Sequence, residues 1–398
     1  MNAPVAGLPV EGSALDARLN QELERLRAAD LYRQRRVIDG SHGVQLTVAG
    51  KSCISFCSND YLGLASDPRV AEAGRAALSR VGTGSGAAAL ISGYNAEHAR
   101  LEEELADYCG RPRVLLFSSG WAANLGLLRA LYGRDDTLIC DELNHASLID
   151  GGRLSGARYV RVPHADLAAV DAALVEAQAG GGEVGIVSDS IFSMDGDEAD
   201  VPALNRLARR SGASLIIDDA HGFGVLPSPA LRYAGLDAPE VYVATLGKSL
   251  GAAGAFVAGS EALIEYLIQR ARTWVFSTAP PPAIAAAARA ALAIIRAEPE
   301  HQARLARNIA RFRAGIAALG QDLPFELMAS TTPIQPLLVG DAGRAMALSR
   351  QLFERGYWVA AIRPPTVPAG TSRLRVTLSA AHTEAQIDGL VEAVASVL

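Results

Sequence analysis

The sequence has few cysteines and no excess of basic residues. Its 398 residues include four cysteines, too few to cross-link a chain of this length, and the pair Cys53/Cys57 has no second pair to complete a zinc site. We therefore expect a reduced, cytoplasmic protein without a bound metal. The net charge of −6 argues against a nucleic-acid surface, which needs clustered lysine and arginine.

Long apolar runs and targeting patterns are also missing. Residues 1–12 lack the basic segment and apolar run of a signal peptide. The most apolar long stretch, 282–295, is rich in alanine and interrupted by Arg289, whereas a membrane span needs about 20 mostly apolar residues. We expect no membrane and no nucleic acid among the partners. The length allows one large α/β domain or a large and a small one.

The N-terminal segment predicts a helix over 13–36. Four leucines repeat there at helical spacing with charges on the other faces, so we expect one amphipathic helix that packs on a larger body. Two short β-type runs follow, at 44–48 and 53–56, around a turn at Gly50. The leucines are Leu15, Leu19, Leu23 and Leu26.

Short apolar runs that alternate with helical patterns fill the middle of the chain. Most are nearly continuous, as expected of strands buried on both faces, so they predict a mainly parallel sheet with helices on both faces. Ligand sites in such sheets lie at the carboxyl ends of the strands, where polar residues gather in this sequence. The predicted strands are 114–117, 137–140, 158–162, 184–189, 214–218, 241–245 and 255–258.

The last hundred residues predict a smaller α+β unit. A proline-rich turn at 278–282 and an alanine-rich helix precede it. The unit begins with a charged helix at about 299–319. Strands at 334–339, 357–360 and 374–378 then alternate with two helices, of which the second is 384–398. The predicted division is an N-terminal helix with short strands (1–59), a large domain (60–295) and a small C-terminal domain (296–398).

Two glycine-rich motifs of nucleotide-binding proteins fail on context. Residues 84–89 match G-x-G-x-x-A, but the preceding segment predicts a helix instead of the strand that the dinucleotide motif needs. Residues 247–249 (GKS) resemble the end of a P-loop, but Tyr242 stands where the first glycine belongs. Neither motif supports nucleotide binding.

An acid and a lysine follow two of the predicted buried strands. Asp218 ends one run, and a carboxylate in a water-poor place is costly unless it meets a positive partner such as a protonated pyridine nitrogen. Lys248, 30 residues on, is placed to form a Schiff base with an aldehyde. The alternative is structural: Asp218 caps the next helix, and Lys248 pairs with Asp218 or Asp219.

Together these segments resemble the pyridoxal-phosphate-dependent α-oxoamine synthases of fold type I. The motifs that carry the resemblance run in one order: FCSNDYLGLA (56–65), LFSSGWAAN (116–124), DELNHASLIDG (141–151), IFSMDGD (191–197), IIDDAHGFGV (216–225), TLGKSLG (245–251), FSTAPPP (276–282) and AIRPPTVPAGTSRLRVTLSAAHT (361–383). The resemblance implies an α/β fold with a large cofactor domain and a small α+β domain. It also implies pyridoxal 5'-phosphate as cofactor and a homodimer with its sites at the subunit interface.

The resemblance implies roles for residues around the cofactor. Lys248 would hold the cofactor covalently and move the substrate's α-proton. Asp218 would pair with the pyridine nitrogen, and His221 would hydrogen-bond the phenolic oxygen of the ring. His145 would stack on the ring face and help to place the acyl substrate; the plainer alternative is a satisfied polar residue in a loop. The further cofactor contacts that it implies are Ser193, Thr245 and, across the dimer interface, Thr278.

A phosphate site is predicted at the start of the helix after 114–117. The first turn of a helix has unpaired N–H groups and the positive end of the dipole, so Gly120 and Trp121 can cradle phosphate through the main chain. The family usually carries phenylalanine at the position of Trp121. The alternative for this indole is an ordinary core side chain.

Arginines are the candidates for substrate binding. By resemblance, Arg375 with Asn59 would grip the α-carboxylate of an amino acid, whose planar shape suits a guanidinium. Arg33 and Thr366 match positions that contact the acyl donor or product. Two plainer alternatives are open: Arg375 on an exposed strand face, and Arg33 as a solvated surface charge.

The implied activity is the decarboxylative condensation of an amino acid with an acyl thioester. The C-terminal motif favours L-alanine and a pimeloyl thioester, carried by coenzyme A or an acyl carrier protein, over glycine and acetyl-CoA. Residues 87–90 (AAAL) replace a stretch that is richer in glycine or arginine in the family, which leaves the acyl-chain preference open. The other classes to weigh are an aminotransferase and a cofactor-binding protein without catalysis, and the latter should lack part of the set Lys248, Asp218, His221 and Arg375.

Overall fold

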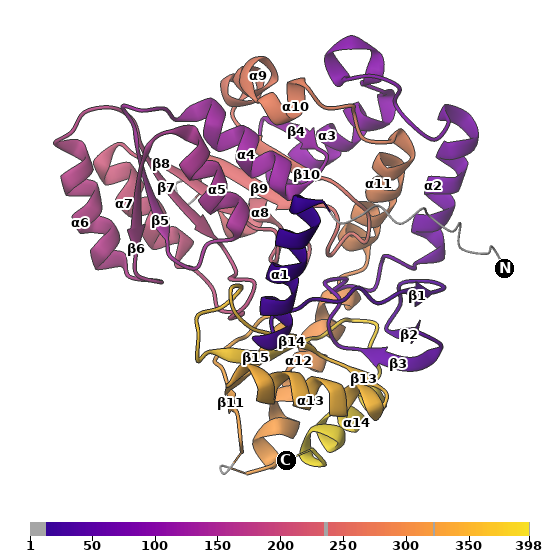
Figure 1. Ribbon diagram of the computed structural model, residues 1–398. Helices are drawn as coiled ribbons and strands as arrows, with labels where there is room; N and C mark the ends of the chain where they lie inside the picture. Colours follow the sequence, from indigo (N-terminus) through magenta and orange to yellow (C-terminus); the bar gives the residue numbers. More distant parts are fainter. Residues whose placement is uncertain (1–12, 235–237, 321–322, 398) are drawn as a thin grey trace.

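The computed structural model describes residues 13–234, 238–320 and 323–397, which form three sheets with helices packed around them (Figure 1). Residues 1–12, for which the sequence predicts no signal peptide, lie outside this part of the chain, as does Leu398 at the end of the predicted last helix. Among the described residues, no helix has both the length and the apolar character needed to cross a bilayer.

The largest sheet has seven strands, and all seven were predicted to within one residue at each end. Neighbouring strands pair in parallel except β10, which is antiparallel to both of its neighbours. In order across the sheet, the strands are β4 (Arg113–Phe117), β10 (Ala255–Gly259), β9 (Val241–Thr245), β8 (Ser214–Asp218), β7 (Val184–Asp189), β5 (Thr137–Asp141) and β6 (Arg158–Val162). The mainly parallel sheet is therefore confirmed.

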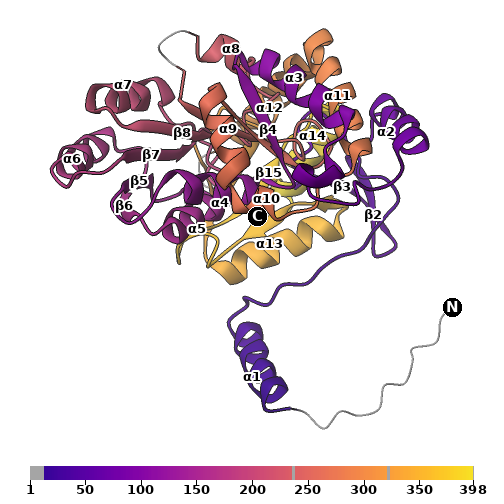
Figure 2. The same ribbon diagram turned by 90° about the horizontal axis from the view of Figure 1, so that it is seen from above.

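Helices cover both faces of this sheet (Figures 1 and 2). Because side chains alternate along a strand, Leu115 and Phe117 enter one apolar cluster and Val114 and Leu116 enter the other. The helices of the first face are α4 (Gly120–Leu131), α5 (Ala146–Ser155) and α9 (Glu261–Arg270). Those of the second are α3 (Ala96–Cys109), α6 (Leu167–Gln178), α7 (Val201–Ser211) and α11 (Pro282–Ala297).

The N-terminal helix differs from its prediction in length and packing. A capping box between Ser13 and Asp16 starts α1 (Ala14–Ala28), which ends before Asp30 takes a left-handed φ of 55°. None of its residues is buried, and Figure 2 shows the helix standing away from the rest of the chain. The predicted continuation to residue 36 is wrong, and the predicted packing of the helix on a larger body stays a prediction.

One predicted strand in the C-terminal part is split between two sheets. Of residues 357–360, β13 (Tyr357–Trp358) pairs in parallel with β3, while β14 (Ala360–Ile362) joins the C-terminal sheet. The N-terminal sheet has the order β1 (Ile38–Asp39), β2 (Gln45–Val48), β3 (Lys51–Ser55), β13, and the C-terminal sheet has the order β11 (Glu326–Leu327), β12 (Ile334–Gly340), β15 (Ser372–Thr377), β14. The N-terminal sheet thus includes a strand from the C-terminal part of the chain. The domain boundaries stay a prediction.

Further helices complete the structure around these sheets. They are α2 (Pro68–Val81), the π-helix η1 (Ala89–Gly93), α8 (Pro229–Arg232), α10 (Arg272–Val275), α12 (Glu300–Ala318), α13 (Ala342–Glu354) and α14 (Glu384–Ala395). The helix predicted up to residue 398 ends at Ala395. Helix α2 precedes residues 84–89, which agrees with the rejection of the dinucleotide motif.

His164 joins two loops at the carboxyl edge of the large sheet. Its Nδ1 lies 3.0 Å from Oδ1 of Asp141 at the end of β5, and its Nε2 lies 2.7 Å from Oδ2 of Asp197 in the loop after β7. Burial opposes the charge, but the two carboxylates outweigh it and raise the pKa of His164 to about 10. A charged His164 therefore acts as a clamp: it bridges Asp141 and Asp197 and so fixes the loop that also carries Ser193.

Replacing His164 with glutamine should remove a pH-dependent part of the stability. Its pKa in the folded chain lies above the ordinary value of 6.5, so the contribution is complete below pH 6.5 and is lost as the pH rises through about 10. We expect urea unfolding to give a loss of about 2 kcal/mol at pH 6 that shrinks toward pH 10. His42→Gln, at an exposed position, is the control. An equal loss at both pH values would contradict a charged clamp.

Candidate active site

Lys248 lies in the turn after β9, where His221 contacts its amine. The distance from Nζ of Lys248 to Nε2 of His221 is 2.6 Å. Burial lowers the pKa of Lys248 to about 8, although Asp218 and Asp189 oppose the shift. A substantial neutral fraction is therefore present near pH 8, as a nucleophilic amine requires. The chain has one other lysine, Lys51, which is exposed and donates to a backbone carbonyl.

The two acids after β8 have different partners. Asp218 is 5% exposed; it accepts a hydrogen bond from Nδ2 of Asn124 at 2.7 Å and another from a backbone amide two residues on. Asp219 forms an ion pair with Arg232 at 3.1 Å. In the described part of the chain, no ion pair includes Asp218 or Lys248. Asp218 does cap its own turn, but the alternative in which Lys248 pairs with either acid is wrong.

His145 is the N-cap of α5, and the contacts of its backbone and ring fix its position. Its backbone N–H donates to Asp189 at 2.6 Å, and its Nδ1 lies 2.7 Å from Oγ of Ser147. The residue is exposed, with Trp121 edge-on at a ring-centroid distance of 6.4 Å. The open face of the imidazole suits stacking on a planar ring, a role that stays a prediction.

The start of α4 is open, as a phosphate site requires. Oγ of Ser119 accepts from the amide of Ala122 at 3.1 Å, and helix geometry leaves the amides of Gly120 and Trp121 without carbonyl partners in the helix. A Cβ on Gly120 would meet no atom within 4 Å. Trp121 is 45% exposed, so the alternative of a core side chain is wrong.

This donor set fits pyridoxal phosphate. A buried carboxylate without a cation (Asp218) suits the ring nitrogen, a buried amine (Lys248) suits the aldehyde, and the open helix start at Gly120 suits the phosphate. The three groups follow β8, β9 and β4, at one edge of the sheet. The predicted residues therefore lie at the strand ends of one sheet edge, and their cofactor roles stay predictions.

Arg375 on β15 is buried and lacks an acidic partner. Its Nε donates to the carbonyl of Ser193 at 2.6 Å, and its Nη1 and Nη2 lie 3.2 and 3.3 Å from Oδ1 of Asn59. The neighbouring Arg373 pairs with Asp195 at 2.5 Å, whereas no ion pair among the described residues includes Arg375. Arg375 is 6% exposed, so the exposed-strand alternative is wrong. A buried guanidinium without an acid is suited to a carboxylate ligand.

Arg33 and Thr366 are brought together from opposite ends of the chain. Nη2 of Arg33 donates to Oγ1 of Thr366 at 3.2 Å, and both residues are exposed. Next to them, Arg363 donates to the carbonyl of Tyr32 at 2.7 Å and holds the segment after α1 in place. Arg33 thus contacts Thr366, the other residue predicted to contact the acyl donor. Their contact with that donor stays a prediction.

Two predicted cofactor residues lie in different surroundings. Oγ1 of Thr245 donates to the carbonyl of Gly254 at 2.9 Å, so it shapes the turn that carries Lys248. Thr278 is exposed and forms a β-bridge with Ala88, just before η1. Among the described residues, no hydrogen bond joins Thr278 to Lys248. The cofactor contacts of both residues, and of the Ser193 side chain, stay predictions.

Sequence reasoning missed three residues that organise the site. Tyr61 is fully buried and its Oη lies 2.6 Å from Nδ1 of His221, while Asn124 and Asp189 contact Asp218 and His145 as described above. Burial, together with the negative charge of Asp218, raises the pKa of Asp189 well above its usual range. Tyr61 and Asn124 stand within quoted motifs, and Asp189 ends a predicted strand, so their positions were visible but their partners were not.

Comparison with known proteins adds an independent observation. The sequence model of the family "Aminotransferase class I and II" matches residues 51–394. An 8-amino-7-oxononanoate synthase of Methylococcus capsulatus is 55% identical over 378 residues, covering 94% of this chain and 96% of that protein. A second one, of Alkalilimnicola ehrlichii, is 52% identical and covers 98% and 100%.

Solved structures agree with this result. Serine palmitoyltransferase of Sphingomonas wittichii superposes with a TM-score of 0.88 at 27% identity, covering 96% of this chain and 97% of that one. An 8-amino-7-oxononanoate synthase of Francisella tularensis gives a TM-score of 0.73 at 30% identity, covering 87% and 97%.

Proposed function

Because this chain belongs to the class I and II aminotransferase family, and within it to the 8-amino-7-oxononanoate synthases, we propose that it joins L-alanine to a pimeloyl thioester with loss of carbon dioxide. The product is 8-amino-7-oxononanoate, an intermediate of biotin biosynthesis, and the thiol carrier is released. The enzyme is a pyridoxal-phosphate-dependent acyltransferase.

One observation carries the choice of an amino acid as substrate. An amino acid presents an amine and a carboxylate close together, and this site holds a matching pair of groups. Lys248 offers an amine that can exchange with the substrate's, and Arg375 is a buried guanidinium without an acid of its own. Hydrogen bonds through His221, Tyr61 and Asn59 join the two, so both groups face one site.

The chain's own residues then divide the work of the reaction. Bound pyridoxal phosphate supplies an aldehyde that links to amines and a protonated ring that withdraws electrons from the substrate's α-carbon. Arg375 would orient the carboxylate, and the amine of Lys248 would take and return a proton at that carbon. Asp218 keeps the ring nitrogen charged. The open face of His145 holds the reacting groups in line.

The acyl donor approaches from the side of α1 in this proposal. Arg33 and Thr366, joined by their hydrogen bond, offer a guanidinium and a hydroxyl for the thioester or its carrier. The carrier is coenzyme A or an acyl carrier protein. The variant stretch 87–90 lies at the start of η1 beside Thr278, and we propose that it influences acyl-chain length.

We also propose a homodimer that works in the cytoplasm. Large apolar side chains are exposed on η1 and near α10, among them Ile91 at 79% and Phe276 at 71%. A second copy of the chain would cover them and bring Thr278 toward the partner's phosphate. The four cysteines are free, which suits a reducing compartment.

A substrate panel tests the reaction. With purified enzyme and pyridoxal phosphate, we expect thiol release from L-alanine and pimeloyl-CoA with a kcat/KM at least about 10-fold higher than from glycine and acetyl-CoA. The product is identified by mass spectrometry, and pimeloyl-acyl carrier protein is compared as donor. Faster turnover of the glycine pair would favour a glycine C-acetyltransferase. Formation of a keto acid without carbon dioxide would favour an aminotransferase.

A further inference from the structure

An unbroken line of hydrogen bonds joins the carboxylate-binding arginine to the lysine. Nη1 of Arg375 lies 3.2 Å from Oδ1 of Asn59, and Oη of Tyr61 lies 3.1 Å from the same oxygen. The same hydroxyl lies 2.6 Å from Nδ1 of His221, whose Nε2 lies 2.6 Å from Nζ of Lys248. Tyr61 is the member that both halves of the line share.

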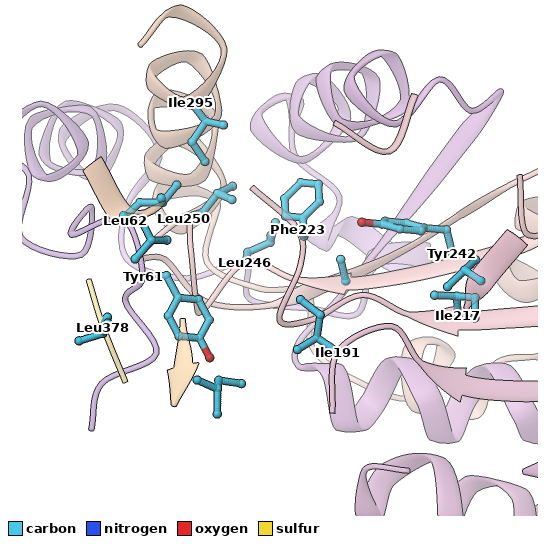
Figure 3. Packing of buried hydrophobic residues seen from close by; sticks show 14 of the residues in the cluster. Tyr61, Leu62, Ile191, Ile217, Phe223, Tyr242, Leu246, Leu250, Ile295 and Leu378 are labelled. Carbon is cyan, nitrogen blue, oxygen red and sulfur yellow. The ribbon is translucent and has the colours of Figure 1, made fainter. Parts of the chain in front are cut away.

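Tyr61 is held rigidly and has a single proton to donate. Its side chain is fully buried in the apolar cluster that includes Leu62 and Leu250, and Figure 3 shows its hydroxyl directed away from both. Burial raises the pKa of Tyr61 while Arg375 opposes the shift, so the hydroxyl stays protonated. One proton cannot satisfy two acceptors at once, so it points either to Asn59 or to His221.

His221 is the group that responds to this choice. Burial and the nearby charges of Lys248 and Arg375 lower its pKa well below the usual range, so the ring is neutral and carries one proton. The hydrogen bond made by one ring nitrogen decides which nitrogen holds that proton. When the hydroxyl of Tyr61 points to Asn59, Nδ1 of His221 donates to Tyr61 and Nε2 is free to accept.

Two arrangements follow, each suited to one occupant of the site. A protonated Lys248 can only donate, so it needs Nε2 of His221 as an acceptor and the hydroxyl of Tyr61 turned to Asn59. The phenolic oxygen of the cofactor is an acceptor, so it needs a proton on Nε2 and the hydroxyl turned to Nδ1. The same four side chains satisfy both arrangements when the O–H bond of Tyr61 rotates and the ring proton of His221 moves from Nδ1 to Nε2.

We propose that Tyr61 is a positioning residue that sets which ring nitrogen of His221 carries the proton, and that through Asn59 it couples the occupancy of Arg375 to Lys248. A carboxylate on Arg375 draws guanidinium N–H groups away from Oδ1 of Asn59. That oxygen then accepts more strongly from Tyr61, which favours the arrangement in which Nε2 of His221 accepts from an amine. That L-alanine supplies this carboxylate rests on the proposed function. The line of hydrogen bonds from Arg375 to Lys248, called the relay below, does not depend on it.

Nitrogen-15 NMR of histidine-labelled full-length protein, before and after addition of pyridoxal phosphate, tests the inference. His221→Gln identifies the signals of His221. In the wild-type protein without cofactor, we expect the proton mainly on Nδ1, with transfer to Nε2 when the cofactor binds. In Tyr61→Phe, which keeps the buried ring, we expect a mixture of the two forms without cofactor. Tyr132→Phe, which removes another buried hydroxyl, is the matched control.

Asn59→Leu gives a second variant with a definite direction. Without Oδ1, the hydroxyl of Tyr61 has only Nδ1 of His221 to donate to, so we expect the proton on Nε2 even before the cofactor binds. Propionate, a carboxylate without an amine, should move the wild-type His221 signals further toward the Nδ1 form and leave those of Tyr61→Phe unchanged. If both variants keep the wild-type form of His221, the relay is wrong. A failed substrate panel beside these shifts would remove the proposed function and leave the relay standing.

Discussion

Replacing Lys248 with alanine should abolish turnover, lowering kcat by about 10,000-fold or more, because one amine performs two tasks. In the proposed reaction it holds the cofactor covalently and moves the proton at the substrate's α-carbon. Its lowered pKa, about 8, provides the neutral amine that both tasks need. A variant at this position leaves the other site residues in place, so we expect the cofactor to bind without a covalent link.

The lysine content of the chain makes the covalent link easy to assign. Lys51 and Lys248 are the two lysines in the sequence, so cofactor fixed by borohydride must map to one of two peptides or to the N-terminus. We expect all of it on the Lys248 peptide in the wild-type enzyme and none fixed in Lys248→Ala. Lys51→Ala, at an exposed position, should retain both the link and the activity. Fixation or turnover in Lys248→Ala would overturn the assignment.

The strands of the large sheet were predictable because their residues are apolar on both faces. Runs such as 184–189 and 241–245 have the length of buried strands and end in polar residues, which favours a strand over a helix and places those polar residues at one edge of the sheet. Local pattern cannot show long-range pairing. The parallel register of Tyr357 with Ile54 depends on a partner 303 positions away, so the sequence predicts one strand over 357–360 where the structure has two.

The candidate site was predictable in its residue types but not in its pairings. Sequence alone left Arg375 open to an exposed face, because alternation along a strand does not say whether both faces are covered. The distinction between Asp218 and Asp219 depends on Arg232, which neutralises only the second acid. The role of Tyr61 was not predictable because the sequence does not show the hydrogen-bond partners of its hydroxyl. Without them, a buried tyrosine is indistinguishable from an ordinary core residue. These are properties of tertiary contacts.

The length and packing of α1 show the same limit at the chain's beginning. The leucine repeat correctly predicted a helix, and the capping box at Ser13 explains where it starts. The repeat could not predict what covers the helix, and none of its residues is buried by the part of the chain that the structure describes. An amphipathic pattern predicts that one face of a helix is apolar. It does not predict which surface packs against that face.

Replacing Arg375 with alanine should raise KM for L-alanine by about 100-fold to 1,000-fold, because it removes charge-assisted hydrogen bonds worth about 3 to 4 kcal/mol in a buried place. The KM for the acyl donor should change far less, since the residues proposed to contact that donor are Arg33 and Thr366. Arg375→Lys should fall between the wild type and alanine, because an ammonium keeps the charge but loses the planar fork. Steady-state kinetics with each substrate varied in turn measures all three.

Arg373, two positions along the same strand, provides the matched comparison that separates binding from structure. It is equally buried, at 4% exposed, but Asp195 already neutralises it at 2.5 Å. Arg373→Ala should therefore lower the melting temperature by leaving a carboxylate unpaired, and it should leave KM for L-alanine within about threefold of the wild type. If both alanine variants raised KM for L-alanine equally, the effect would come from the shared strand. A difference confined to Arg375 would show that the missing acid near this guanidinium is the substrate's own carboxylate.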